Sequence, residues 1–148
     1  MSILAKLQED MKQALRAKDG VTLSTIRLIL SSVSYARIEK GDELTDDEVI
    51  AVISKAAKQR KESIESAKSG NRMDIAEKEK AELDVITKYL PEQLSESDVE
   101  AIAKEIIAEV GASDMKDRGK VMGPLMQKIK GKADGKVASS VVEKLLKG

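Results

Sequence analysis

Apolar residues recur at helical spacing along almost the whole chain, and this pattern constrains the fold more than any other feature. The alternation of apolar and polar residues that marks a half-buried strand is absent even from the Val/Ile/Thr-rich stretch 21–40. Because the 148 residues include two tyrosines and no Phe or Trp, the core must be aliphatic. The sequence therefore predicts an all-α, multihelical protein.

Capping residues and helix breakers divide this pattern into seven expected helices. Ser2 is a predicted N-cap, Thr45 and Glu48 form a predicted capping box, and Ser95 or Ser97 is expected to cap the fifth helix. Ser113 or Asp117 is expected to cap the sixth. The expected helices span residues 3 to about 18, 21–40, 46 to about 68, about 73 to 90, 96 or 98 to 110, 118–130 and 136–147.

The same periodicity predicts which side chains face the core. Tyr89 is expected at the edge of the core, with its hydroxyl group reaching solvent. The inward-facing residues include Leu15, Ile75, Met122 and Met126.

The two prolines mark the points where helical continuity is in question. Pro91 ends the fourth helix, because the residue before a proline disfavours the helical conformation. We therefore expect a four-helix N-terminal subdomain over residues 1–92 and a smaller three-helix C-terminal subdomain over residues 93–148. At Pro124 two alternatives stay open: a helix begins there, or a helix runs through it and lacks one hydrogen bond.

The composition excludes several kinds of chemistry. The chain has no cysteine and no histidine, so thiolate nucleophiles, imidazole acid–base catalysis and Cys/His zinc sites are absent. No Walker or dinucleotide-binding motif is present. We therefore expect no cofactor, no metal site and no catalytic residue. Because the N-terminus lacks an apolar leader and no apolar run approaches the roughly 20 residues that span a bilayer, a cytoplasmic protein without membrane contact is expected.

Positive charge is concentrated in the last third of the chain. The whole chain carries 26 basic and 26 acidic residues, whereas residues 113–148 carry 9 basic and 4 acidic ones. Glycine lets a backbone approach a phosphate closely, and a helix N-terminus and a lysine each add positive charge. The candidate RNA-binding residues are therefore the glycines and lysines of this stretch: Gly119, Lys120, Lys128, Lys130, Gly131, Lys132, Gly135 and Lys136.

A structural explanation of the same residues stays open. Gly131 is a suitable helix C-cap, residues 133–135 are suitable for a tight turn between helices, and the lysines are typical of a solvated helix face.

Several segments in a fixed order resemble the GatB/YqeY family, most closely its stand-alone YqeY-type proteins. The resemblance covers essentially the whole chain, and Arg118 and Pro124 are atypical within it. The segments are Arg27-Leu28-Ile29, Lys58-Gln59-Arg60-Lys61-Glu62-Ser63-Ile64, Tyr89-Leu90-Pro91-Glu92-Gln93-Leu94-Ser95, Lys116-Asp117, Gly119-Lys120-Val121-Met122-Gly123, Leu125-Met126 and Gly131-Lys132-Ala133-Asp134-Gly135.

The resemblance implies an all-α module like the C-terminal tail of GatB, a component of the aminoacyl-tRNA amidotransferase, and this tail is associated with tRNA recognition. The implied partners are tRNA or another structured RNA. The alternative is a protein-interaction adaptor for a synthetase or an amidotransferase. A carbon–nitrogen ligase activity with glutamine as the nitrogen donor is implied only by family association, because the catalytic parts of that enzyme lie outside this module.

Overall fold

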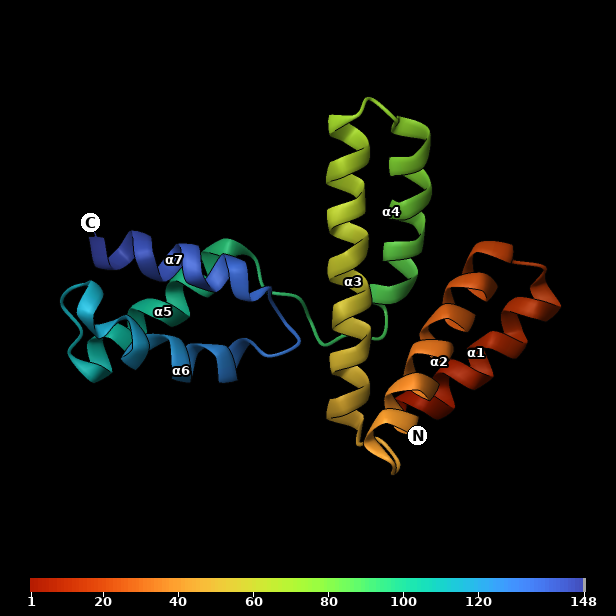
Figure 1. Cartoon of the computed structure of the whole chain (residues 1–148), viewed down its shortest axis with the longest axis horizontal. Helices are drawn as coiled ribbons and strands as arrows, with labels where there is room; N and C mark the ends of the chain where they lie inside the picture. The colour runs from red at the N-terminus through yellow and green to blue at the C-terminus, as the bar shows by residue number, and fades with distance from the viewer. Residues whose placement is uncertain (148) are drawn as a thin grey trace. The chain divides into compact units, whose positions relative to one another are not determined.

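The computed structural model describes residues 1–147, and over this range it contains seven α-helices, one 3₁₀ turn and no strand (Figure 1). This confirms the predicted all-α, multihelical class. The helices are α1 (Ile3–Ala17), α2 (Gly20–Lys40), α3 (Asp46–Ser69), α4 (Met73–Thr87), α5 (Glu96–Val110), α6 (Arg118–Ile129) and α7 (Gly135–Lys147), with the 3₁₀ turn η1 (Met115–Asp117) before α6.

Local capping interactions explain why α1, α3 and α5 begin where the sequence predicted, whereas Asp117 forms no side-chain cap bond at the start of α6. The Ser2 hydroxyl accepts a hydrogen bond from the Ala5 N–H at 3.1 Å and opens α1. Thr45 and Glu48 form the expected capping box of α3. Ser95, rather than Ser97, caps α5, again in a capping box. These contacts join residues three positions apart, so the sequence alone contains the signal for them.

The contacts between helices divide the chain into two compact units, which we call the N-terminal unit (Met1–Leu90) and the C-terminal unit (from Pro91 onward). Each unit has a core of its own. The core of the N-terminal unit includes Leu7, Ile26, Ile53 and Ile86, all at most 1% exposed. The core of the C-terminal unit is formed by buried aliphatic residues of α5, α6 and α7: Val99, Ala103, Ile106, Val121, Leu125, Ile129, Ala138, Val141, Val142 and Leu146.

A hydrogen bond joins α1 to the last residues of the N-terminal unit. The Tyr89 hydroxyl donates to the Asp10 carboxylate at 2.6 Å, and the Lys6 ammonium lies 5.6 Å from the centre of the Tyr89 ring. Tyr89 is 9% exposed, and its hydroxyl group is bonded to the partly exposed carboxylate of Asp10 on α1. Burial and the bond to Asp10 raise the pKa of Tyr89. The same bond, together with Lys6, lowers the pKa of Asp10.

Pro124 lies inside α6, which begins six residues earlier at Arg118. Of the two alternatives, the structure selects the helix that lacks one hydrogen bond. The physical reason is packing: Val121, Leu125 and Ile129 lie on one face of α6, and all three are fully buried. Their burial requires a helix that continues through the proline.

Several predictions about individual side chains and helix ends are wrong. Leu15, Ile75 and Met126 were expected in the core, but they are 58%, 38% and 41% exposed. Met122 is half-buried against the core of the C-terminal unit. Helix α4 ends at Thr87, short of the expected Leu90, because the chain turns before Pro91. In α6 the buried stripe follows Val121 and Leu125, which turns Met126 outward.

Candidate nucleic-acid interface

The predicted glycines and lysines lie on α6, on the first turn of α7 and on the connection between these helices. Lys130, Lys132 and Lys136 are brought near one another at this connection by their closeness in the chain. Lys120 lies near the opposite end of α6, ten residues before Lys130, or about 15 Å along the helix axis. The structure therefore separates Lys120 from the other three lysines.

The backbone of the connection between α6 and α7 forms its hydrogen bonds within the chain. The carbonyl oxygens of Gly131 and Lys132 accept from Gln93 Nε2 at 2.9 Å and from the Leu94 N–H at 2.8 Å. At the start of α7, the Asp134 side chain accepts from the Lys136 N–H at 3.1 Å. These groups anchor the connection to the segment before α5, so the side chains of its lysines are what it offers to a partner.

The fold itself accounts for two of the predicted glycines. Gly131 has a φ of 75°, in the left-handed region that favours glycine, where it follows the end of α6. A Cβ atom added to Gly135 would lie 3.2 Å from Cε of Met126, so close packing favours glycine there. Gly119 differs, because a Cβ atom there would meet nothing within 4 Å. The same holds for Gly123, which shares an exposed face of α6 with Gly119.

The lysines of this region differ in their surroundings. Lys120 forms an ion pair with Asp117 at 3.5 Å. A bond from the Ser113 N–H, with Lys120 contributing, holds the pKa of Asp117 below its usual range. Lys128, Lys130 and Lys132 are exposed and form no ion pair with residues 1–147. Their charges are therefore available to an external anion.

Two further lysines belong to the same surface, and the sequence analysis missed them. Lys144 and Lys147 are exposed on α7, eight and eleven residues after Lys136. This spacing places all three on one helix face, together with the exposed Ser140. The helical period contains this signal, because residues four and eight positions apart lie on one face of a helix.

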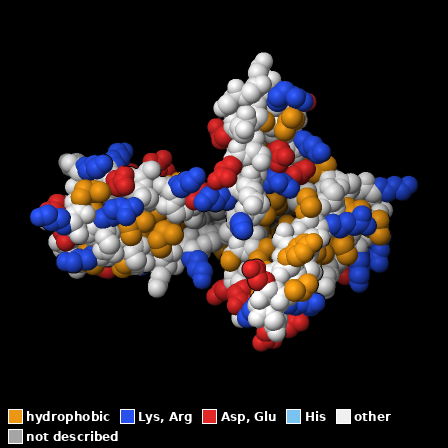
Figure 2. Space-filling model, in the orientation of Figure 1, with side chains coloured by type: hydrophobic (Ala, Val, Ile, Leu, Met, Phe, Trp, Pro, Cys, Tyr) orange, Lys and Arg blue, Asp and Glu red, His pale blue; other side chains and the backbone are white. Residues whose placement is uncertain are grey.

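Acidic and basic residues occupy different helices of the C-terminal unit. Helix α5 carries five acidic residues and one lysine, whereas α6 carries three basic residues and no acid. The one acid of α7, Glu143, lies 3.8 Å from Nε of Arg118, and the Nη2 atom of Arg118 donates to the Ser139 hydroxyl at 2.6 Å. Figure 2 shows basic side chains spread over the visible face of this unit. The outer surfaces of α6 and α7 are thus positively charged.

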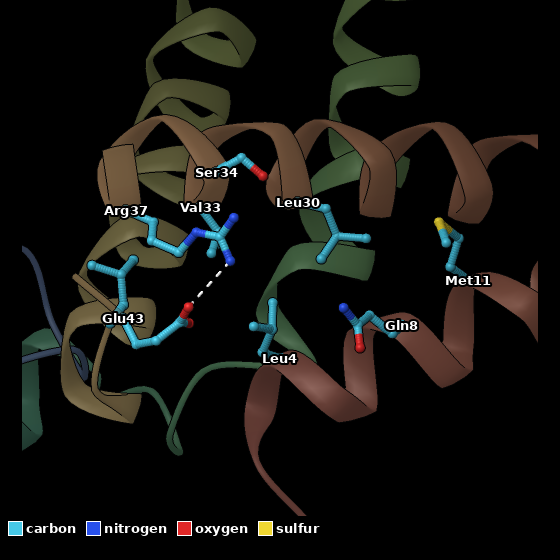
Figure 3. Close-up of a pocket in the computed structure, with 9 residues that line it drawn as sticks. Leu4, Gln8, Met11, Leu30, Val33, Ser34, Arg37 and Glu43 are labelled. Atoms are coloured by element: carbon cyan, nitrogen blue, oxygen red, sulfur yellow. Dashed lines mark hydrogen bonds and ion pairs between the residues drawn. The ribbon is translucent and has the colours of Figure 1, made fainter. Parts of the chain in front are cut away.

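The N-terminal unit offers a groove of a different kind, lined by residues of α1, α2 and the segment after α2 (Figure 3). Its volume is about 290 Å³, and most of its wall is aliphatic, with Leu4, Leu30 and Val33 among the lining residues. At its rim Arg37 and Glu43 form an ion pair at 3.3 Å. The groove suits an aliphatic group, and its lining residues include no nucleophile beside a base.

Neither unit contains a feature that indicates a membrane span or a metal centre. Within residues 1–147 no helix is both long and apolar enough to cross a bilayer. Over the same range, no three carboxylates gather in a way that could hold a metal ion.

Comparison with known proteins identifies the family. Residues 4–146 match the family described as "Yqey-like protein". The chain belongs to the YqeY family. This confirms the YqeY resemblance inferred from the sequence.

The curated relatives of this YqeY-family chain include fungal proteins named "Altered inheritance of mitochondria protein 41, mitochondrial". The relative from Pyrenophora tritici-repentis is 32% identical over 147 residues, covering 97% of this chain and 81% of the relative. The relative from Lachancea thermotolerans is 33% identical over 114 residues, covering 75% of this chain and 61% of the relative. The one from Clavispora lusitaniae is 34% identical over 115 residues, covering 76% and 67%.

The expectation of a cytoplasmic protein is contradicted by these relatives, which are named as mitochondrial proteins. The expectation rested on the absence of an apolar leader. That criterion distinguishes secreted proteins, whereas mitochondrial targeting relies on amphipathic, arginine-rich segments that it does not detect.

Proposed function

We propose that this YqeY-family protein is an RNA-binding accessory protein, which holds tRNA or another structured RNA by its phosphates. The observation that carries the proposal is the charged surface of α6 and α7, where the lysines are exposed and the one acid of α7 is paired with Arg118. Lysine contacts with phosphates supply most of the sequence-independent affinity of such proteins. The preference for tRNA rests on the resemblance to the amidotransferase tail, and the proposal assigns no chemistry to this chain.

The absence of aromatic residues from the C-terminal unit defines the kind of RNA further. Both tyrosines of the chain, Tyr35 and Tyr89, belong to the N-terminal unit. Proteins that hold single strands usually stack the bases on aromatic rings, whereas double-helical RNA is recognised through its shape and phosphates. We therefore expect a folded RNA to bind better than an unstructured strand of the same length.

The test is a binding titration with tRNA at several salt concentrations. We expect the logarithm of the affinity to fall linearly with the logarithm of the salt concentration. A triple variant, Lys132→Ala, Lys136→Ala and Lys144→Ala, should weaken binding and reduce this slope by about 2–3. The matched control removes three exposed lysines of the N-terminal unit, by Lys12→Ala, Lys55→Ala and Lys78→Ala. It lowers the net charge equally and should leave the slope unchanged.

Three outcomes would overturn the proposal. They are no affinity for tRNA at low salt, an unchanged slope in the triple variant, or an equal loss in the control. Recovery of a protein partner after RNase treatment, in the absence of RNA affinity, would instead favour the adaptor function that the resemblance also implies.

A further inference from the structure

Helix α2 has a second apolar face that no other part of its own unit covers. Its buried face contributes Ile26, Ile29 and Val33 to the core of the N-terminal unit. On the opposite side, Val21, Leu28, Tyr35 and Ile38 are 44%, 53%, 76% and 74% exposed. Figure 2 shows hydrophobic side chains gathered over this helix. Single exposed apolar residues need no explanation, but a row of them along one helix does.

The spacing of this second face is that of a helix-pairing seam. Val21, Leu28 and Tyr35 recur every seven residues, and so do Ser24, Ser31 and Ile38, three positions later. This is the arrangement of the two core positions in a coiled coil, which lie along the side of a helix that meets another helix. Because the seam runs from Val21 to Ile38, it extends for about 26 Å along α2.

We propose that this seam pairs with the same seam of a second copy of the chain, with the two α2 helices antiparallel. In the register that overlaps the whole seam, Val21 lies opposite Ile38 of the second copy. Tyr35 then lies over Ser24, and Leu28 over Ser31. Each large side chain thereby meets a serine or an aliphatic side chain. A parallel pair would instead place Tyr35 against Tyr35 and Ser24 against Ser24, crowding one level of the seam and leaving a void at another.

The charges at the two ends of α2 favour the same orientation. Around its start, Arg16 and Lys18 are exposed and form no ion pair with residues 1–147. Around its end, Glu39 and Asp42 are likewise exposed without an ion pair to the described residues.

The basic residues near that end are already occupied. Arg37 is paired with Glu43 at 3.3 Å, and Lys40 with Glu48 at 2.8 Å. An antiparallel arrangement places the basic start of one α2 beside the acidic end of the other. Two-fold symmetry repeats this contact between basic and acidic residues at both ends of the pair. The dipoles of the two antiparallel helices point in opposite directions, which also favours this orientation. The charges, like the side-chain sizes, therefore select a second copy in the antiparallel orientation.

The first experiment measures the mass of the full-length protein in solution over a wide concentration range, without RNA. We expect a monomer–dimer equilibrium. The variant Leu28→Glu should raise the dissociation constant roughly tenfold or more. The matched control, Ile75→Glu, adds the same charge at an exposed apolar residue of α4, away from the seam, and should leave the equilibrium unchanged. A monomer at every concentration, or equal effects of the two variants, would overturn the proposal.

The second experiment determines the orientation, and it is possible because the chain has no cysteine. In the antiparallel register the two Ser31 side chains lie about 4.5 Å apart along the helix axes, so a Ser31→Cys variant should cross-link to itself with a short bifunctional reagent. The two Ser24 side chains lie about 16 Å apart, so Ser24→Cys should not cross-link alone but should do so when mixed with Tyr35→Cys. Efficient self-cross-linking of Ser24→Cys would contradict the antiparallel pair. The inference does not depend on RNA binding, and neither experiment uses RNA.

Discussion

The two units of the molecule distribute their charges in opposite ways. In the N-terminal unit, acids and bases are interspersed, and several pair between elements, as Arg60 of α3 does with Glu79 and Glu82 of α4. In the C-terminal unit, α5 holds half of the acids, whereas α6 and α7 hold most of the bases. The net charge of zero therefore reflects the mixing of acids and bases in the N-terminal unit. In the C-terminal unit it conceals their separation onto different helices. Charge balance over a whole sequence excludes a polyanion-binding surface only when its acids and bases share the same faces.

The largest expected effects test whether the two units are stable separately. Ile53→Ala in the N-terminal unit and Leu125→Ala in the C-terminal unit each remove a fully buried side chain. Each should cost about 2–5 kcal/mol in the free energy of unfolding, within its own unit. Amide hydrogen exchange, resolved by residue, measures where protection is lost. If Leu125→Ala also lowered protection throughout α1–α4, the division into two units would be wrong as an energetic description.

The next effect tests the ion pairs that distinguish the N-terminal unit. Arg60→Ala should cost about 1–3 kcal/mol in the free energy of unfolding, because Glu79 and Glu82, 22% and 13% exposed, would lose their shared partner. Arg118→Ala in the C-terminal unit should cost less than about 1 kcal/mol, because Arg118 and Glu143 are both more exposed. Urea unfolding measures both values. If the two variants lost the same free energy of unfolding, the ion pairs would not distinguish the N-terminal unit from the C-terminal unit.

A smaller effect concerns the bond between Tyr89 and Asp10, which ties the two ends of the N-terminal unit together. Tyr89→Phe should cost about 1–2 kcal/mol near neutral pH. The pKa of Asp10 is lowered in the fold, so its part of this stability is lost as the pH falls below the usual Asp value of about 4. The pKa of Tyr89 is raised, so its part is lost as the pH rises above about 10.

The stability difference between wild type and Tyr89→Phe should therefore be constant between these limits and shrink beyond both. Unfolding measured across the pH range tests this. A difference that grows in acid would show that the bond does not require an ionised Asp10.

The last expected effect is a gain rather than a loss. Pro124→Ala should stabilise the C-terminal unit by about 1 kcal/mol. It restores a hydrogen bond within α6, although the greater freedom of the unfolded chain offsets part of the roughly 3 kcal/mol that proline costs in a helix interior. Thermal unfolding of the variant measures the gain. A loss of stability would mean that the proline is needed for the packing of α6 against α5 and α7.

Features encoded by neighbouring residues were predictable from the sequence, and those encoded by packing were not. The capping box at Thr45 and Glu48 joins residues three positions apart, so its residues alone predict where α3 begins. Pro124 shows the opposite case: the local rule for proline favours a break, but the burial of Val121, Leu125 and Ile129 decides in favour of a continuous helix. The bond between Asp10 and Tyr89 joins residues 79 positions apart, and no local signal marks it.

The candidate site shows the same division. The local basic excess and the glycine φ at position 131 could be inferred from residue types in sequence. The bond from the Lys136 N–H to the Asp134 side chain joins residues two positions apart, so residue types alone could have indicated it, whereas the packing of Met126 over Gly135 required the path of the chain. Lys144 and Lys147 could have been predicted from the helical period, because they lie on the same face of α7 as Lys136.

The burial of Tyr89 has a consequence for anyone who follows the unfolding of this protein. With no Trp or Phe in the chain, and with Tyr35 76% exposed, intrinsic fluorescence and near-ultraviolet dichroism depend almost entirely on the surroundings of one ring. That ring belongs to the N-terminal unit, and the C-terminal unit contributes no aromatic signal at all. A single transition in either of these two signals would therefore describe only the N-terminal unit, and unfolding of the unit with the basic helices would not be detected.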